Sequence, residues 1–211
     1  DAVASYRKAL AIKPNFAGAH YNLGNALREL GNLDESVVCY SEALAIKLDY
    51  AEAHGNLGLT LQEQGRLDEA IDSYHKSLTI KPDFAEMHSN LGSALREIGR
   101  LDEAIACYQK ALSIKPAFAE AYSSLGNTLQ ELGRSDEALF YHYKSIDIKP
   151  DFAVAHCNLA VTLEELGRLD EAVASYHKAL AINSYYAEAH NNLGAALQGL
   201  GMLNEAVASY Q

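Results

Sequence analysis

A 34-residue period runs through the 211-residue chain and constrains its fold more than any other feature. In the segment 85–118, Leu91 and Gly92 form a pair that returns along the chain. It recurs as Leu57–Gly58, Leu125–Gly126 and Leu193–Gly194. Gly99 and Pro116 recur with the same spacing. A fixed period of about 20–50 residues indicates a solenoid, in which each unit buries its apolar face against its neighbours.

Counted from Ala17, the period defines five complete units and two partial ones. The complete units are 17–50, 51–84, 85–118, 119–152 and 153–186, and the partial ones are 1–16 and 187–211. No linker, low-complexity segment or second domain interrupts them. We therefore expect residues 1–211 to form a single array. Apolar residues make up 49% of the chain, which argues against disorder.

Each unit contains two helical patterns, which we illustrate with the third unit. The apolar spacing predicts a first helix over Ala85–Ile98, ended by Gly99 in a left-handed conformation, and a second over Asp102–Lys115. We expect Asp102 and its equivalents to cap the second helices, and Asp83 with Glu86 to form a capping box on the first. The equivalents of Asp102 are Asp34, Asp68, Asp136, Asp170 and Asn204.

Gly92 lies inside the predicted first helix, where glycine costs about 1 kcal/mol relative to alanine. The glycine recurs as Gly24, Gly58, Gly126 and Gly194, with Ala160 in its place once. A cost repeated at one position indicates a repeated steric need. We therefore predict that the second helix approaches closely at this point.

The net charge of −11 disfavours nucleic acid and anionic membranes as partners. No apolar run approaches the ~20 residues that span a bilayer. No signal peptide is visible, so a cytoplasmic location is expected, although the chain opens part-way through a repeat. No phosphate loop, dinucleotide fingerprint or nucleophile motif is present, and we expect neither an enzyme nor a cofactor.

The repeat pattern resembles the tetratricopeptide repeat family. The third unit matches that family at Leu91, Gly92, Ala104, Tyr108, Ala111 and Pro116. The family's early aromatic position is instead occupied by His20, His54, His88, Tyr122, His156 and His190. The resemblance implies an all-α, right-handed superhelical solenoid of antiparallel helix pairs, with the first helices lining a concave groove that binds protein or peptide.

One position of the first helix carries asparagine in five units, and we call it the asparagine register. Its members are Asn22, Asn56, Asn90, Asn158 and Asn192, with Ser124 in the fourth unit. Asparagine is a mediocre helix former, and its amide both donates and accepts hydrogen bonds. Helices about 10 Å apart would place one asparagine at roughly every third residue of an extended peptide. The alternative is that each amide ties one helix to its neighbour.

Other polar residues are expected beside this register. Asn25 and Asn127 lie one turn later, as does Ser93. A line of acids follows at Glu29, Glu63, Glu97, Glu131 and Glu165, for which a solvated face is favoured over contacts with a basic ligand. The histidines are spaced one per repeat, and we expect them to pack against the paired helix rather than to bind a metal.

The asparagine register also resembles the repeat region of O-linked N-acetylglucosamine transferases. In that family, groove asparagines hold the substrate polypeptide, which implies the same role for the five asparagines here. The resemblance leaves a second function open, as the substrate arm of a Ser/Thr glycosyltransferase whose catalytic domain lies outside this chain. A third is a scaffold that associates end to end through the partial units.

Overall fold

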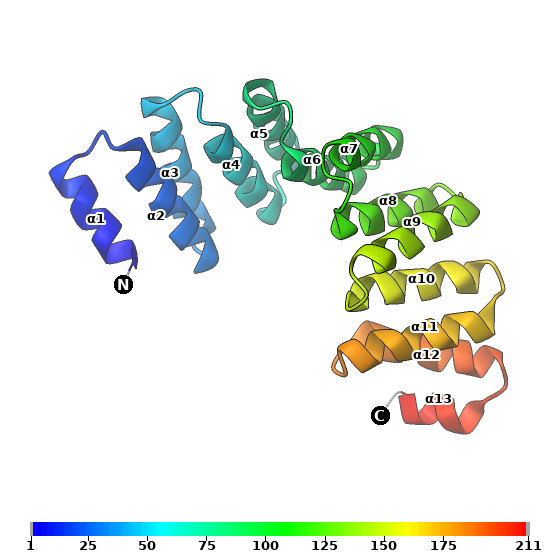
Figure 1. The fold of residues 1–211 in the computed structure, drawn as a ribbon. Coiled ribbons are helices and arrows are strands. Elements are labelled where there is room, and N and C mark those ends of the chain that lie inside the picture. Colours follow the sequence, from blue (N-terminus) through cyan, green and yellow to red (C-terminus); the bar gives the residue numbers. More distant parts are fainter. Residues whose placement is uncertain (1, 210–211) are drawn as a thin grey trace. The chain divides into compact units, whose positions relative to one another are not determined.

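The computed structural model describes residues 2–209 (Figure 1), and these residues form helices and short connections without a strand. The helices in this part of the chain are α1 (Ala2–Ile12), α2 (Ala17–Glu29), α3 (Leu33–Ile46), α4 (Ala51–Glu63), α5 (Leu67–Ile80), α6 (Ala85–Glu97), α7 (Leu101–Ile114), α8 (Ala119–Glu131), α9 (Ser135–Ile148), α10 (Ala153–Glu165), α11 (Leu169–Ile182), α12 (Ala187–Gly199) and α13 (Leu203–Ser209). The predicted all-α class is confirmed.

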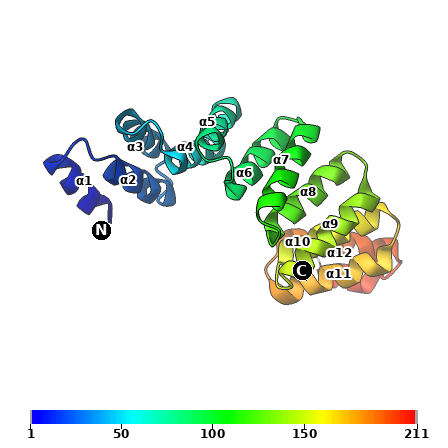
Figure 2. The ribbon, with the colours of Figure 1, turned by 45° about the horizontal axis from the view of Figure 1, so that its top comes forward.

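The helices pack as pairs, one pair to a repeat (Figures 1 and 2). The most extensive contacts join α2 to α3, α4 to α5, α6 to α7, α8 to α9 and α10 to α11. The chain forms two compact units, which divide between Ile114 and Lys115. This arrangement confirms stacked helix pairs, while the single continuous array over 1–211 stays a prediction.

Within each unit the first helices of successive repeats touch one another. In the N-terminal unit α4 contacts both α2 and α6, and in the C-terminal unit α10 contacts both α8 and α12. Among the described residues no comparable contact joins the second helices of neighbouring repeats. The first helices therefore form the closely packed row of each unit.

The predicted glycine at the end of each first helix is confirmed. Gly99 has φ +78°, and its equivalents Gly31, Gly65, Gly133, Gly167 and Gly201 have φ between +72° and +77°. The Gly99 amide donates to the carbonyl of Arg96 and the Arg100 amide to that of Leu95, which satisfies carbonyls at the helix end. Glycine reverses the chain here because it accepts positive φ without a Cβ clash.

The predicted aspartate caps are wrong. Helix α5 begins at Leu67, so Asp68 lies within its first turn, and Arg66 occupies the N-cap without a side-chain hydrogen bond. Likewise α6 begins at Ala85 behind Phe84, and no side chain caps it. The carboxylates remain favourable in the first turn through the helix dipole.

The connection between repeats is held by a lysine, an aromatic ring and a histidine. Lys81 Nζ lies 4.2 Å from the centre of the Phe84 ring, and His88 Nε2 lies 2.9 Å from the carbonyl oxygen of Pro82. The same histidine–carbonyl contact joins His20 to Pro14, His54 to Leu48, His156 to Pro150 and His190 to Ser184. The histidines therefore support the turns between repeats. The sequence pattern predicts only that they pack against the paired helix, and it does not predict this contact.

The helices bury the predicted apolar stripes. Leu91, Leu95 and Tyr108 are at most 3% exposed, whereas Ile98, expected on the same face, is 36% exposed at the helix end. None of the described helices is long and apolar enough to cross a membrane.

Candidate functional site: the first-helix face

The asparagine register lies on the row of first helices, and we call this side of each unit the first-helix face. Helices α2, α4 and α6 carry Asn22, Asn56 and Asn90 in the N-terminal unit, and α10 and α12 carry Asn158 and Asn192 in the C-terminal unit. Asn22 is exposed, and the other four are half-buried. Asn25 on α2 and Asn127 on α8 are also half-buried.

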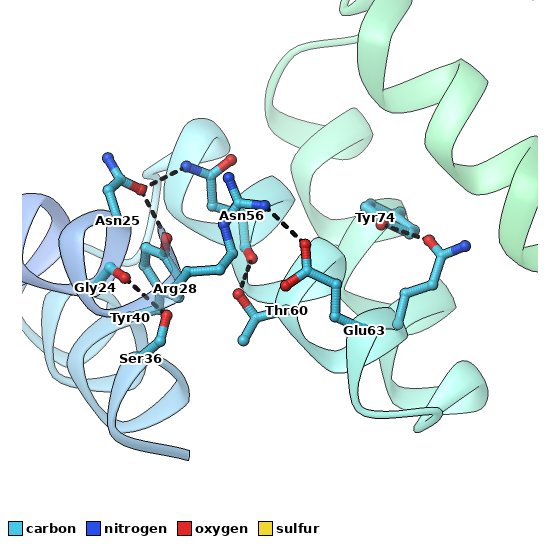
Figure 3. A network of polar contacts seen from close by, with 10 residues as sticks. Gly24, Asn25, Arg28, Ser36, Tyr40, Asn56, Thr60, Glu63 and Tyr74 are labelled. Carbon is cyan, nitrogen blue, oxygen red and sulfur yellow. Dashed lines mark hydrogen bonds and ion pairs between the residues drawn. The ribbon is translucent and has the colours of Figure 1, made fainter. Parts of the chain in front are cut away.

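Asn56 is hydrogen-bonded across to the preceding first helix (Figure 3). Its Nδ2 donates to Asn25 Oδ1 at 2.8 Å and contacts the Tyr21 hydroxyl at 3.1 Å. Asn25 Oδ1 also accepts a hydrogen bond of 2.7 Å from the Tyr40 hydroxyl. A register asparagine, its neighbour one turn along and a tyrosine of the second helix thus form one network.

The glycine inside α2 makes this network possible. Tyr40 is fully buried, and a Cβ atom on Gly24 would lie 2.8 Å from its ring. Gly92 stands in the same relation to Tyr108, where the distance would be 3.0 Å. The predicted close approach is confirmed, and the group that approaches is the tyrosine ring.

The buried tyrosines place their hydroxyl groups at the first-helix face. Tyr74 donates to Gln62 Oε1 at 2.9 Å, and Tyr176 donates to Glu164 Oε2 at 3.2 Å. Burial raises the pKa of Tyr74 and Tyr176 far above the ordinary tyrosine range, so both remain donors. Sequence reasoning missed this role, although the tyrosine recurs 16 residues after the glycine and could have indicated it.

The network fixes which way the two amides face. Burial raises the pKa of the Tyr40 hydroxyl, so this group keeps its proton and donates it to Asn25 Oδ1. Asn25 must then present its oxygen to Tyr40 and Asn56. This leaves Asn25 Nδ2 as a donor and Asn56 Oδ1 as an acceptor that the described residues do not use.

The C-terminal unit contains a similar contact between repeats. Asn158 Nδ2 donates to Ser123 Oγ at 3.0 Å, and the Thr162 hydroxyl donates to Gln130 Oε1 at 2.9 Å. Asn192 accepts a bond of 3.2 Å from its neighbour Asn191. Asn158, like Asn56, therefore ties successive first helices together. For these two members of the register, the alternative that each amide binds the neighbouring helix is confirmed.

Three of the predicted residues have no such structural role. The side chains of Asn22, Asn90 and Asn127 form no hydrogen bond with the described part of the chain. Asn22 and Asn90 lie on α2 and α6, on either side of α4. Their amides are available to a ligand without loss of a contact within the protein.

The acidic line is exposed, but it also links repeats. Arg28 Nη1 lies 2.9 Å from Glu63 Oε1, and Gln130 Nε2 donates to Glu165 Oε1 at 2.7 Å. Gln62 donates to Glu97 in the same way. These carboxylates are therefore partly neutralised or hydrogen-bonded by the preceding repeat, and they belong to the contact between repeats as much as to a solvated face.

Pockets elsewhere do not involve the predicted residues. A cavity of about 400 Å³ in the N-terminal unit is lined mainly by second-helix residues, among them Leu78, Cys107 and Lys110. Burial raises the pKa of Cys107 to about 11, so this thiol is not activated. Within residues 2–209, no group of three or more histidine, cysteine, aspartate or glutamate side chains is placed to hold a metal ion.

The fold and its polar face define a class of helical-repeat proteins in which each repeat contributes one pair of helices. Models of the TPR repeat match residues 1–27, 24–65, 92–133 and 163–201, and further tetratricopeptide repeat models match 51–84, 119–152 and 143–174. The chain belongs to the tetratricopeptide repeat family. The matching models are repeat models, and no catalytic family is among them.

Solved structures with the same fold include other TPR proteins. A crystal structure of MamA is 31% identical, covers 79% of this chain and 97% of its own length, and gives a TM-score of 0.69. YrrB, described as a TPR protein with an unusual peptide-binding site, is 24% identical over 87% of this chain and 95% of its own length, with a TM-score of 0.67. The pilF protein of Pseudomonas aeruginosa is 23% identical over 92% of this chain and 88% of its own, with a TM-score of 0.81. No curated protein sequence matches significantly.

Proposed function

We propose that this chain is a non-catalytic protein-interaction scaffold whose first-helix face binds extended polypeptide through the peptide backbone. The observation that carries the proposal is the Asn25–Asn56 pair, which presents an unused amide donor beside an unused amide acceptor. The hydrogen bond that the buried Tyr40 donates to Asn25 Oδ1 holds this orientation before a ligand arrives (Figure 3). Fixed polar groups bind more tightly because less ordering is needed on association.

The donor and acceptor match the chemistry of an extended chain. The N–H and C=O groups of one residue in a β-strand point to the same side, and a partner that offers an acceptor and a donor can bind both. Asn56 Oδ1 would accept the ligand N–H, and Asn25 Nδ2 would donate to the ligand C=O. Such binding reads the backbone and tolerates many side chains.

The remaining asparagines extend the proposed site within each unit. Asn22 and Asn90 would contact the ligand in the N-terminal unit, and Asn158, Asn192 and Asn127 in the C-terminal unit. Asn56 and Asn158 would serve both roles, since only the Nδ2 of each is engaged by the preceding helix. Ser124 interrupts the register in the fourth repeat. Residues 1–211 would act as one array, with the first helices lining the ligand groove.

The family supports the kind of partner proposed. YrrB has the same fold and is described as having a peptide-binding site, which favours polypeptide as the ligand class. The negative charge of the chain favours neutral or basic polypeptides over nucleic acid or anionic membranes. If the chain were the substrate arm of a glycosyltransferase, the polypeptide would bind to the same face. The family models that match are all repeat models, so they do not favour this alternative. End-to-end association stays a separate prediction, and sedimentation over a range of protein concentrations would test it.

The proposal is tested with an array of overlapping unstructured peptides cut from unrelated proteins. We expect the chain to bind many tiles that share no side-chain motif, and to bind the corresponding intact folded proteins poorly. An array on which no tile binds above background would refute polypeptide binding. Binding confined to one side-chain motif would refute recognition through the backbone.

A further inference from the structure

Glu164 carries a negative charge at a position where the fold requires only a hydrogen-bond acceptor. It lies six residues after Asn158, at a position that other repeats fill with arginine or glutamine. The equivalents are Arg28, Gln62, Arg96, Gln130 and Gln198. Glu164 accepts a bond from the Tyr176 hydroxyl at 3.2 Å, and Gln62 accepts the same bond from Tyr74 at 2.9 Å. A neutral amide therefore fulfils this structural role elsewhere in the chain.

The charge of Glu164 is also uncompensated. No lysine, arginine or histidine among the described residues forms an ion pair with it. The arrangement contrasts with the N-terminal unit, where Arg28 and Glu63 pair at 2.9 Å. It contrasts too with Glu165, which accepts bonds from Gln130 at 2.7 Å and from the Ser135 hydroxyl at 2.9 Å.

The surroundings of Glu164 make this charge costly. The side chain is half-buried, and burial raises the pKa of its carboxyl group. The hydrogen bond from the Tyr176 hydroxyl lowers this pKa by a smaller amount. The nearby Cys157 thiol has a pKa raised to about 11, first by burial and then by the charge of Glu188, with Glu164 contributing further. No neighbouring cation offsets the cost of removing the carboxylate from water. A charge kept under such conditions favours a role in binding.

We propose that Glu164 is a subsite for one basic side chain, arginine or lysine, of the polypeptide that lies on the first-helix face. Tyr176 occupies Oε2, and Oε1 accepts from the ligand cation. The inference rests on the proposed function and adds a charge preference to a site that otherwise reads only the backbone. A planar guanidinium suits this position best, because it can donate to the carboxylate while it stacks over neighbouring side chains.

The test uses two labelled, unstructured peptides of serine, glycine and alanine that differ at one central residue, arginine or its neutral isostere citrulline. Fluorescence anisotropy measures the affinity of each peptide for the wild-type chain and for Glu164→Gln. The variant keeps an acceptor for Tyr176, as Gln62 does for Tyr74, and an unchanged melting temperature confirms this. We expect the wild type to prefer the arginine peptide about ten-fold and Glu164→Gln to lose the preference.

The adjacent carboxylate supplies a matched control. Glu165→Gln removes an equal charge, but Glu165 is already hydrogen-bonded to Gln130 and Ser135, so this variant should keep the preference for arginine. If the wild type binds both peptides equally, the subsite is refuted and the backbone-binding function stands. If Glu164→Gln retains the preference, the subsite is likewise refuted. If neither peptide binds any variant, the proposed function fails and the subsite with it.

Discussion

The sulfur atom of Met87 fills the space into which a Cβ atom on Gly55 would project. Gly55 lies on α4 and Met87 on α6, so the two residues meet between successive first helices. The position of Met87 is alanine in the other repeats, at Ala19, Ala53, Ala121, Ala155 and Ala189. Met87 is 6% exposed. The long side chain of Met87 therefore packs against Gly55, which has no side chain, at the contact between these two repeats.

A double-mutant cycle tests this match. Met87→Ala leaves a cavity, which typically costs about 2–5 kcal/mol, and Gly55→Ala overpacks the site at about 1–3 kcal/mol. In the double variant each change relieves the other. We expect the free energy of unfolding of the double variant, measured by urea denaturation, to exceed the value given by adding the two single effects by at least about 1 kcal/mol. Effects that add to within about 0.5 kcal/mol would show that the residues act independently.

His142 predicts a pH dependence of stability. It replaces the buried tyrosine of the other repeats, is fully buried, and neither ring nitrogen has a hydrogen-bond partner in the described structure. Burial lowers its pKa from 6.5 to about 4. The unfolded chain therefore binds the proton more strongly, so the contribution of His142 to stability is intact above pH 6.5 and is lost as the pH falls toward 4. The loss amounts to about 3 kcal/mol.

The matched variant for this effect is His142→Tyr. Tyrosine fits opposite glycine in the other repeats, and its hydroxyl should reach Gln130 as Tyr74 reaches Gln62. Urea denaturation at pH 7.5, 6, 5 and 4.5 would be compared for the two proteins, since the remaining histidines titrate in both. We expect the stability difference between them to widen as the pH falls. A constant difference would contradict a neutral, buried His142.

Gly99 and Gly18 predict opposite effects of the same substitution. Gly99 has φ +78°, where an alanine side chain is strained, so Gly99→Ala should destabilise the chain by about 1–2 kcal/mol. Gly18 lies in the first turn of α2, and a Cβ atom there would only touch Phe16 at 3.4 Å. Gly18→Ala should therefore be neutral or stabilise by up to about 1 kcal/mol. Thermal melts of both variants check the two signs, and equal shifts would contradict the assignment.

Much of the fold was predictable because the period repeats the same physical requirements. Gly99 marks the end of the first helix, Leu91 and Tyr108 mark the buried sides of the first and second helices, and each inference was confirmed at several equivalent positions. The predicted start of the first helix at Ala85 was right, whereas that of the second helix was wrong by one residue, because an aspartate near an N-terminus is favourable both as a cap and within the first turn. Asp68 takes the second role.

The candidate site was less predictable, since its contacts join residues of different repeats. The sequence indicates that Asn56 lies on the first-helix face. Whether its amide binds a ligand or a neighbouring helix depends on the distance to Asn25 and on the direction in which the Tyr40 hydroxyl donates its proton. A sequence pattern gives neither. The structure separates Asn56 and Asn158, which bind neighbouring repeats, from Asn22 and Asn90, which do not.

This separation provides the most direct measurement of backbone recognition. Asn22→Ala with Asn90→Ala removes two face amides without breaking a described hydrogen bond, so any effect on binding is not caused by a damaged fold, and a melting curve verifies this. Affinities for a set of peptide tiles of unrelated sequence would be measured for the wild type and this variant. Recognition through the backbone predicts a loss of about ten-fold or more that is similar for all tiles. Unchanged affinities, or losses confined to tiles with one side chain in common, would contradict it.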